Sequence, residues 1–480
     1  MSESSSFNTL SLLPEIVLAL AGLLILMVNA FSHDRARASY RWIAGLGSLV
    51  ALLLCFQPLA TGDAFMGTAV MDGLALAGSA VVLVVLLLLV IGGEDYLRTR
   101  RVPLAEYHSL SLFAAVGMLA LCSAGDLVVV FLGIEILSIS LYCMAALLNE
   151  REGSREAALK YFLTGSFASG FLLFGMALIF GYTGSTSLTV IGESLQRLDT
   201  NNWMLIGGIL LMLVGFLFKV SAVPFHNWAP DVYEGSPTVV TVFMSTAAKA
   251  AAFTGFARVF VPALGEASAS WVPMLAFCAG LTMLVGNFTA LVQASFKRML
   301  AWSGVAHAGY LLLGIMAAGD NALHVRSVLF YLLPYALING VLFLLGAAIT
   351  RQRGGEYDLD DFKGLAADQP WLAILMTVCL LALAGIPPTA GFVGKFYLFM
   401  GAVETGHVSL AVLGLLTSVV SVYFYLRVVV FAWFHRSPSG KPAFTRPDGG
   451  LMFVTTVASG LLLALGIWPN LWLFMTQNIG

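Results

Sequence analysis

The sequence predicts an all-α protein that crosses a membrane many times. Hydrophobic residues make up 59% of the 480-residue chain and charged residues only 10%, and the mean hydropathy is +0.91. Apolar runs of about 20 residues, the length of a membrane-spanning helix, follow one another along the whole chain. A water-soluble fold contains far fewer apolar residues than this, so a bundle of membrane helices is expected.

Fourteen apolar runs are separated by short polar or charged stretches. In chain order, the residue ranges expected to form helices are 10–31, 42–60, 72–93, 108–124, 127–148, 157–182, 204–236, 238–261, 271–292, 298–318, 322–350, 372–403, 409–434 and 451–476. The longest stretches between them hold about 20 residues, which is too few for a separate soluble domain. Residues 1–480 are therefore expected to form a single membrane domain.

The seventh and twelfth runs, 204–236 and 372–403, are too long for one straight crossing. Each contains a proline break, at Pro224 in the first and at Pro387 and Pro388 in the second. Proline lacks a backbone donor and clashes with the preceding helical turn. Both helices are therefore expected to be discontinuous, with unwound backbone lining a cavity.

The basic residues predict the orientation of the bundle. Of the 24 lysines and arginines, 16 fall between an odd-numbered helix and the next even-numbered one, and three fall on the opposite side. Basic loops stay in the cytoplasm, so both termini are expected outside and the number of helices is expected to be even. The start, MSESSSFNTL, lacks the basic region of a removable signal, so the first helix is expected to stay.

The positions of the broken helices indicate an internal repeat. Helices 4–8, within residues 108–261, and helices 9–13, within residues 271–435, are two sets of five, and the fourth member of each set is the broken one. Because five is odd, the second set is expected to be inverted relative to the first, as in many transporters. Residues 1–107 then hold three N-terminal helices, and residues 451–476 form helix 14.

Ionisable side chains within the predicted helices are the candidate functional residues, because each costs about 2.5–3.5 kcal/mol to insert into a membrane. Glu135 lies roughly 12–14 Å along helix 5 from Asp126, near the middle of the membrane. Lys219 lies deep in helix 7, just before its break. Burial favours the neutral form of a lysine and a nearby carboxylate favours the charged form, so this pair can load and release a proton. The alternatives are a structural ion pair for Glu135 and a snorkelling side chain for Lys219.

Two further lysines extend this series. Lys249 lies about eleven residues, or ~16 Å, into helix 8, among alanines and a threonine. Lys395 follows the double-proline break of helix 12 and has glycines around it, which suits a half-unwound helix beside a cavity. Both are expected to carry protons, Lys249 in the middle of a pathway and Lys395 towards its exit. A structural role is the alternative for each.

Three other residues are also candidates for the relay. The imidazole of His307, in helix 10, accepts and donates protons near neutral pH and can bridge two lysines. His226 follows the break in helix 7, and Lys160 lies one turn into helix 6 after a basic loop. The alternative is a hydrogen-bonded core residue for each histidine and an interfacial, snorkelling side chain for Lys160.

No motif for a cofactor or a metal is present. The sequence has no glycine-rich phosphate loop and no nucleotide fingerprint, and its five cysteines are scattered without the spacing of metal ligands. We therefore expect no NAD, flavin, iron–sulfur cluster or metal ion in this chain. There is also no basic tract that would bind nucleic acid.

Two segments resemble a known family. PFHNWAPDVYEGSPT, around the first break, and AGIPPTAGFVGKFYLF, around the second, are similar to the antiporter-like membrane subunits of respiratory complex I, the NADH:quinone oxidoreductase. The resemblance covers essentially the whole chain and includes the buried Glu135, Lys219 and Lys249. It implies that Glu135 and Lys219 are a modulating pair, that Lys249 is the central carrier and Lys395 the exit-side carrier, and that His307 bridges these two.

The resemblance also implies partners and a location. Other subunits of the complex would use NADH, FMN, iron–sulfur clusters and a quinone, while this chain would move protons, driven by quinone reduction elsewhere. Its partners would be antiporter-like and small membrane subunits and the lipid bilayer of the bacterial inner membrane. One alternative is a subunit of a multisubunit cation/proton antiporter, although a metal cation would need more oxygen ligands than the few intramembrane carboxylates supply. The other alternative, an inert scaffold, leaves most of the buried lysines without partners.

Overall fold

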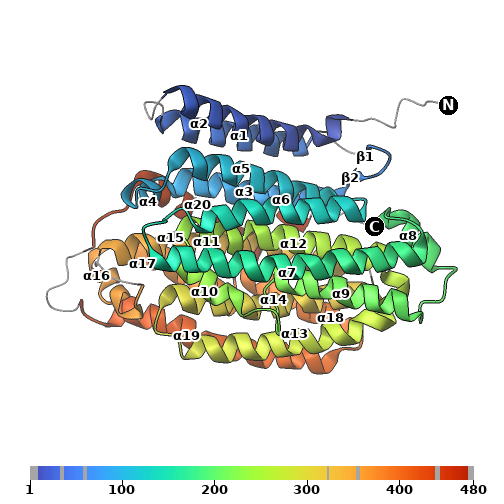
Figure 1. Ribbon diagram of the computed structural model, residues 1–480. Coiled ribbons are helices and arrows are strands. Elements are labelled where there is room, and N and C mark those ends of the chain that lie inside the picture. The colour runs from blue at the N-terminus through green and yellow to red at the C-terminus, as the bar shows by residue number, and fades with distance from the viewer. Residues whose placement is uncertain are drawn as a thin grey trace.

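The computed structural model describes residues 9–32, 37–57, 62–321, 324–352, 357–437 and 444–473 (Figure 1). Long helices form at all fourteen predicted positions, so the all-α, multi-pass fold class is confirmed. They are α1 (Leu13–Ser32), α2 (Arg37–Cys55), α3 (Gly73–Gly92), α5 (Leu104–Ser123), α6 (Leu127–Ala145), α7 (Glu152–Thr183), α9 (Trp203–Lys219) with α10 (Trp228–Gly235), α11 (Thr238–Ser245) with α12 (Ala247–Arg258), α13 (Ser268–Leu291), α14 (Phe296–Asp320), α15 (Val325–Gln352), α17 (Pro370–Ala384) with α18 (Ala390–Glu404), α19 (Val408–Phe434) and α20 (Gly449–Ile467).

Short elements fill the connections between these helices. They are the helices α4 (Glu94–Thr99), α8 (Leu188–Leu195), α16 (Leu365–Asp368) and α21 (Asn470–Leu473), the 3₁₀ turns Thr9–Leu12, Gly265–Ala267 and Leu359–Phe362, and the antiparallel strands β1 (Gly62–Ala64) and β2 (Ala69–Met71). The last long helix ends at Ile467 rather than at residue 476, because Trp468 precedes a proline and leaves the helical conformation. The predicted end of the second helix, at residue 60, lies outside the described residues.

Both predicted breaks are confirmed. In the seventh helix, α9 ends at Lys219, and α10 begins only at Trp228, after the cis peptide bond between Val223 and Pro224. In the twelfth, α17 ends before Gly385, which caps the helix with a left-handed φ of 81°. A glycine adopts this conformation without the steric cost of a side chain.

A third break was not predicted. The eighth helix is interrupted at Thr246, which has a φ of −119° and a ψ of −79° and lies one turn before Lys249. The hydroxyl and the backbone N–H of Thr246 both donate hydrogen bonds to the carbonyl of Val242, so this backbone bond is kept at the break. Neither proline nor glycine lies at this position, so the sequence carries no strong signal for it. At its other end, α12 widens into a π-helical turn, Val259–Ala263, which contains Pro262.

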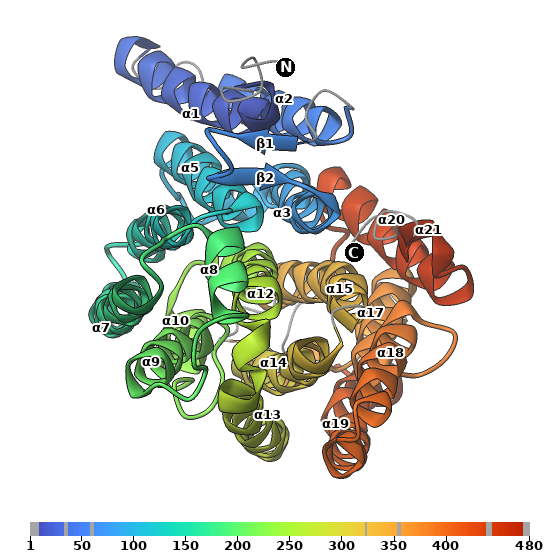
Figure 2. The same cartoon turned by 90° about the vertical axis from the view of Figure 1, so that its right-hand side faces the viewer.

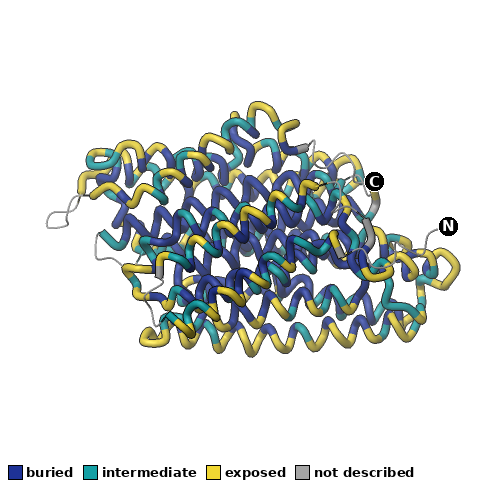
Figure 3. Tube along the Cα trace, turned by 90° about the horizontal axis from the view of Figure 1, so that it is seen from above, coloured by how far each residue is buried: buried dark blue, intermediate teal, exposed yellow. Residues whose placement is uncertain are grey.

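The helices run roughly parallel in a bundle that is buried in the middle and apolar at its surface. Seen end-on, α12, α14 and α15 lie in the centre, α1 and α2 form one edge, and α7, α13 and α19 lie at the periphery (Figure 2). The tube coloured by burial shows the same gradient from core to rim (Figure 3). Large apolar side chains that remain exposed, such as Phe167 and Leu415, are typical of helices that face lipid.

Neighbouring helices recur in the same pattern in the two predicted repeats. In the first set α5 packs on α6 and α12, and in the second α13 packs on α14 and α19. Likewise α6 and α9 both pack on α7, as α14 and α17 both pack on α15. Two copies of one five-helix unit would produce this recurrence, although the boundaries at 108–261 and 271–435 stay a prediction.

The two ends of the bundle differ. The end with α4 and α16, at the left of Figure 1, carries Arg98, Arg151 and Arg351 from the predicted basic loops, and we call it the basic end. The opposite end carries α8, the β1–β2 hairpin and α21 (Figure 2). The start of α1 and the end of α20 both lie at this opposite end, as an even number of crossings requires.

Candidate functional site

Three of the predicted lysines are buried in the bundle, each beside a break in a helix. The exposed fraction is 7% for Lys219, 1% for Lys249 and 4% for Lys395. Within the described part of the chain, none of the three lies within ion-pair distance of a carboxylate. Their ammonium groups are held by backbone carbonyls and hydroxyls instead.

Lys219 ends α9 and reaches towards α6 and α7. Its Nζ donates hydrogen bonds to Ser138 Oγ at 2.8 Å and to the hydroxyl of Tyr161 at 3.3 Å. Ser138 lies one helical turn from Glu135, and the Glu135 carboxylate acts on the Lys219 charge through space. Glu135 Oε1 is buried and has no hydrogen-bond partner among the residues that the structure describes. The structure therefore places Glu135 close enough to act on Lys219 electrostatically, without an ion pair between them.

Lys249 is held by α14, which runs alongside it. Its Nζ donates a hydrogen bond to the carbonyl of Gly304 at 2.8 Å and lies 5.8 Å from the centre of the Tyr335 ring. A Cβ added at Gly304 would lie 3.1 Å from the Tyr335 hydroxyl and 3.7 Å from Nζ, so the glycine keeps this space open. The Tyr335 hydroxyl is buried and has no hydrogen-bond partner among the described residues.

His307 lies between the central and the exit-side lysine, and the charges of both act on it. Hydrogen bonds link its Nδ1 to the hydroxyl of Tyr331 at 2.5 Å and its Nε2 to the hydroxyl of Tyr425 at 3.1 Å. The Tyr425 hydroxyl also bonds Ser303 Oγ at 2.5 Å. The imidazole is thus a member of a buried chain of hydroxyl groups, and both of its nitrogens are used.

Lys395 reaches back across the break in the twelfth helix. Its Nζ donates hydrogen bonds to the carbonyl of Leu383 at 2.7 Å and to Ser418 Oγ at 2.8 Å. The last carbonyls of a helix have no partner within it, so the end of α17 supplies an acceptor for this lysine. Gly385 also allows the close approach, because a Cβ there would lie 3.1 Å from Cδ of Lys395.

These contacts allow each lysine to exist in two protonation states. Carbonyl and hydroxyl oxygens accept hydrogen bonds both from a charged ammonium and from a neutral amine, whereas a carboxylate in contact would strongly favour the charged form. No group of three or more His, Cys, Asp or Glu side chains that can hold a metal ion occurs in the residues that the structure describes.

Comparison with known proteins agrees with this geometry. Residues 124–421 match the family described as NADH:quinone oxidoreductase/Mrp antiporter, TM. NADH-quinone oxidoreductase subunit N of Trichlorobacter lovleyi is 40% identical over 477 residues, which cover 98% of this chain and 97% of that protein. The chain belongs to the subunit N family of NADH-quinone oxidoreductases. Among solved structures, respiratory complex I from Thermus thermophilus with bound aureothin contains a chain that is 34% identical, with a TM-score of 0.82 and coverage of 96% of this chain and 98% of that one.

The fold also occurs outside the subunit N family. A chain of the Mrp complex from Dietzia sp. has a TM-score of 0.82 at 21% sequence identity, covering 98% of this chain and 96% of that one. At this identity the likeness shows a shared fold and nothing more. Fold alone therefore does not separate a redox-driven subunit from an antiporter subunit.

Two of the predicted relay residues, Lys160 and His226, lie apart from the three buried lysines. Lys160 has a side chain that is 44% exposed, and it forms ion pairs with Glu156 at 2.8 Å and Asp231 at 3.1 Å. His226 lies at the break in the seventh helix with its ring 5.4 Å from that of Trp302. In the described part of the chain neither residue forms a hydrogen bond with the three buried lysines, so their membership of the relay stays a prediction.

Sequence reasoning missed several residues that the structure places beside the lysines. The tyrosines at positions 161, 310, 331, 335 and 425 are fully or almost fully buried, and their hydroxyls or rings contact a lysine or His307. The spacing of Tyr331 and Tyr335, four residues apart on one helix face, is the only signal of them in the sequence. Lys297 was also missed. It lies one residue before the predicted start of the tenth helix, at residue 298, and was therefore counted as a loop residue.

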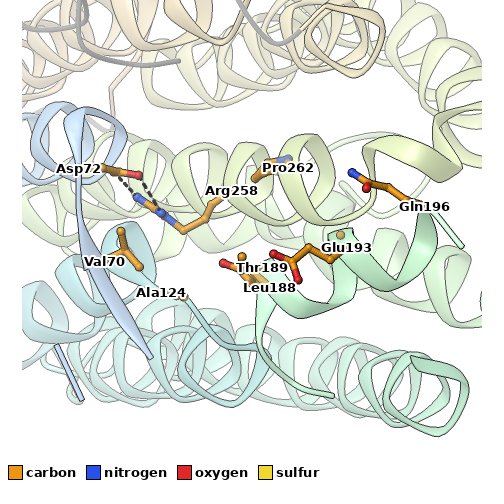
Figure 4. A pocket seen from close by; sticks show the side chains of 11 residues that line it. Val70, Asp72, Ala124, Leu188, Thr189, Glu193, Gln196, Arg258 and Pro262 are labelled. Carbon is orange, nitrogen blue, oxygen red and sulfur yellow. Dashed lines mark hydrogen bonds and ion pairs between the residues drawn. The ribbon is translucent and has the colours of Figure 1, made fainter. Parts of the chain in front are cut away.

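A pocket at the opposite end of the bundle contains a further charged pair (Figure 4). It measures about 360 Å³ and is lined by residues of β2, α8 and the end of α12. At its edge Arg258, whose side chain is 7% exposed, binds Asp72 through both terminal nitrogens at 2.5 and 3.2 Å. Asp72 also caps the start of α3. The pair fastens the start of α3 to the end of α12, away from the buried lysines.

Proposed function

We propose that this chain is the proton-translocating membrane subunit of a bacterial NADH:quinone oxidoreductase. The observation that carries the proposal is the series of buried lysines, each held by neutral oxygens beside a helix break, in a chain of the subunit N family. NADH, FMN, iron–sulfur clusters and the quinone would be bound by other subunits of the complex. This chain would contribute the proton pathway.

We propose a role for each of these buried groups, taken in order along the pathway. Glu135 modulates Lys219 through space, Lys249 carries the proton at the centre, and Lys395 passes it towards the exit. His307 and the tyrosine hydroxyls around it link Lys249 to Lys395. A transferred proton breaks one N–H bond and forms another, so one positive charge moves along the series with each step.

The location and orientation follow from the same proposal. We place the chain in the bacterial inner membrane, with the basic end in the cytoplasm and both termini on the outer side, because basic loops stay on the cytoplasmic side. The other antiporter-like and small membrane subunits of the complex would pack against the apolar rim. A cation/proton antiporter is the competing function, and its fold relative is the Mrp chain.

The test is made on Lys249→Ala and Lys395→Ala variants in membranes of a host that lacks its own copy of this subunit. NADH-driven quinone reduction and proton uptake are measured together, after assembly of the complex has been checked. We expect both rates to fall with assembly intact. Normal turnover and pumping in an assembled complex would refute the relay, and a strict requirement for sodium ions would favour the antiporter.

A further inference from the structure

Lys297, at the start of α14, has the same surroundings as the three lysines of the proposed relay. Its exposed fraction is 3%, and its Nζ donates hydrogen bonds to the backbone carbonyls of Ser236 at 2.6 Å and Glu234 at 3.2 Å. It also lies 5.4 Å from the centre of the Tyr357 ring. No ion pair between described residues includes it. A buried lysine without a contacting carboxylate can lose its proton at little cost.

Solution reaches the neighbourhood of Lys297 through a cluster of charges that are partly exposed. Arg298 pairs with Asp231 at 3.0 Å and with Glu234 at 2.7 Å, and the side chains of all three are about a third exposed. The Glu234 carboxylate therefore turns outward to Arg298, while its backbone carbonyl turns inward to Lys297. The other charges that act on Lys297 come from Arg100 and Arg151 on neighbouring elements.

On its inner side Lys297 is aligned with Lys249. The carbonyl that binds Lys249 belongs to Gly304, seven residues after Lys297 on the same helix. Seven residues are two turns, so the two positions share one face of α14 and lie about 10.5 Å apart along its axis. Tyr233 directly precedes Glu234 on α10, and the hydroxyl of Tyr335, whose ring lies beside Lys249, is buried without a hydrogen-bond partner in the described chain.

We propose that Lys297 is a further proton carrier, which takes up protons at the basic end and delivers them to Lys249. This inference rests on the proposed function. In the step, the Lys297 ammonium loses a proton and the neutral amine of Lys249 gains one, through the tyrosine hydroxyls and water between them. Lys297 is then reprotonated from the solution at the Asp231–Glu234–Arg298 cluster.

A purely structural role for Lys297 is the competing explanation. A cation beside the last carbonyls of α10 stabilises that helix end, whether or not it ever releases a proton. Arginine separates the two roles, because it is also a cation that donates to carbonyls but it does not deprotonate in proteins. Lys297→Arg therefore keeps the cap and removes the carrier.

The experiment compares Lys297→Arg with Lys249→Arg and with Lys363→Arg in the assembled complex, in sealed membrane vesicles energised by NADH. Lys363 is the matched control, since it lies at the same end, pairs with Asp360 at 2.8 Å and lies over the ring of Phe431. We expect proton uptake by Lys297→Arg to fall to the level of Lys249→Arg, while Lys363→Arg pumps like the parent protein.

Other outcomes have distinct meanings. If Lys297→Arg pumps like the control and Lys249→Arg does not, Lys297 is a helix cap only, and the proposed function stands. If Lys249→Arg also pumps normally, the proposed function itself fails. If Lys297→Arg does not assemble, Lys297→His and Lys297→Gln decide: a higher rate for the titratable histidine supports the carrier, and equal rates or a higher rate for glutamine overturn it.

Discussion

Replacement of Asp72 by alanine should lower the free energy of unfolding of the chain and leave the residues of the proton pathway unaffected. Asp72 has two roles, as the cap of α3 and as the partner of Arg258. Loss of the cap costs about 1 kcal/mol. Removal of one partner from a fully buried pair costs about 3–5 kcal/mol, but the Asp72 side chain is 43% exposed, and water screening reduces this to about 1–2 kcal/mol.

The free energy of unfolding of the chain in detergent micelles should therefore fall by about 2–3 kcal/mol. The assay is denaturant unfolding of Asp72→Ala, Arg258→Met and the double variant, with Glu193→Ala, in the same pocket but outside the pair, as control. We expect the double variant to be more stable than the sum of the single losses implies, because no unpaired guanidinium remains buried. A loss below about 0.5 kcal/mol, or strict additivity, would show that the pair does not hold α3 to α12.

Two further predictions concern the proton pathway itself. Ser138→Ala removes from Lys219 a hydrogen bond worth about 1 kcal/mol, so NADH-driven proton uptake should slow with assembly intact. The control is Ser140→Ala, whose hydroxyl bonds to a carbonyl of its own helix. Equal rates of proton uptake in the two variants would refute a role for the Ser138–Lys219 hydrogen bond. Gly394→Ala places a Cβ 2.3 Å from the Tyr331 ring. The variant should therefore be less stable by about 1–3 kcal/mol and take up protons more slowly. An unchanged free energy of unfolding would show that the ring moves freely.

Hydropathy and proline were sufficient to predict the number of helices and two of their breaks. Both signals act locally, since an apolar run must span the bilayer and proline cannot continue a helix. The break at Thr246 was beyond this reasoning, because threonine occurs in many continuous helices and no proline or glycine marks the position. The same holds for the ends of helices, where Lys297 was taken for a loop residue although it lies inside the bundle.

The buried lysines were predicted individually, but their partners were not. Lys219, Lys249 and Lys395 are conspicuous in apolar sequence, whereas Gly304 and Leu383 contribute only backbone carbonyls. A carbonyl acceptor has no sequence signature, because every residue carries one. Contacts between helices that are distant in the chain depend on the packing of the whole bundle, which no local pattern contains.

The tyrosine rings beside the lysines have a consequence for how a charge is tolerated inside a membrane. An ammonium lies 5.1–5.8 Å from a ring centre in four places: Lys219 with Tyr161, Lys249 with Tyr335, Lys297 with Tyr357 and Lys395 with Tyr310. The face of an aromatic ring is a weak, fixed quadrupole that attracts a cation without carrying a net charge. When the proton departs, no anion is left behind in hydrocarbon. The rings thus stabilise each lysine while it is charged and remain neutral themselves when the proton has left.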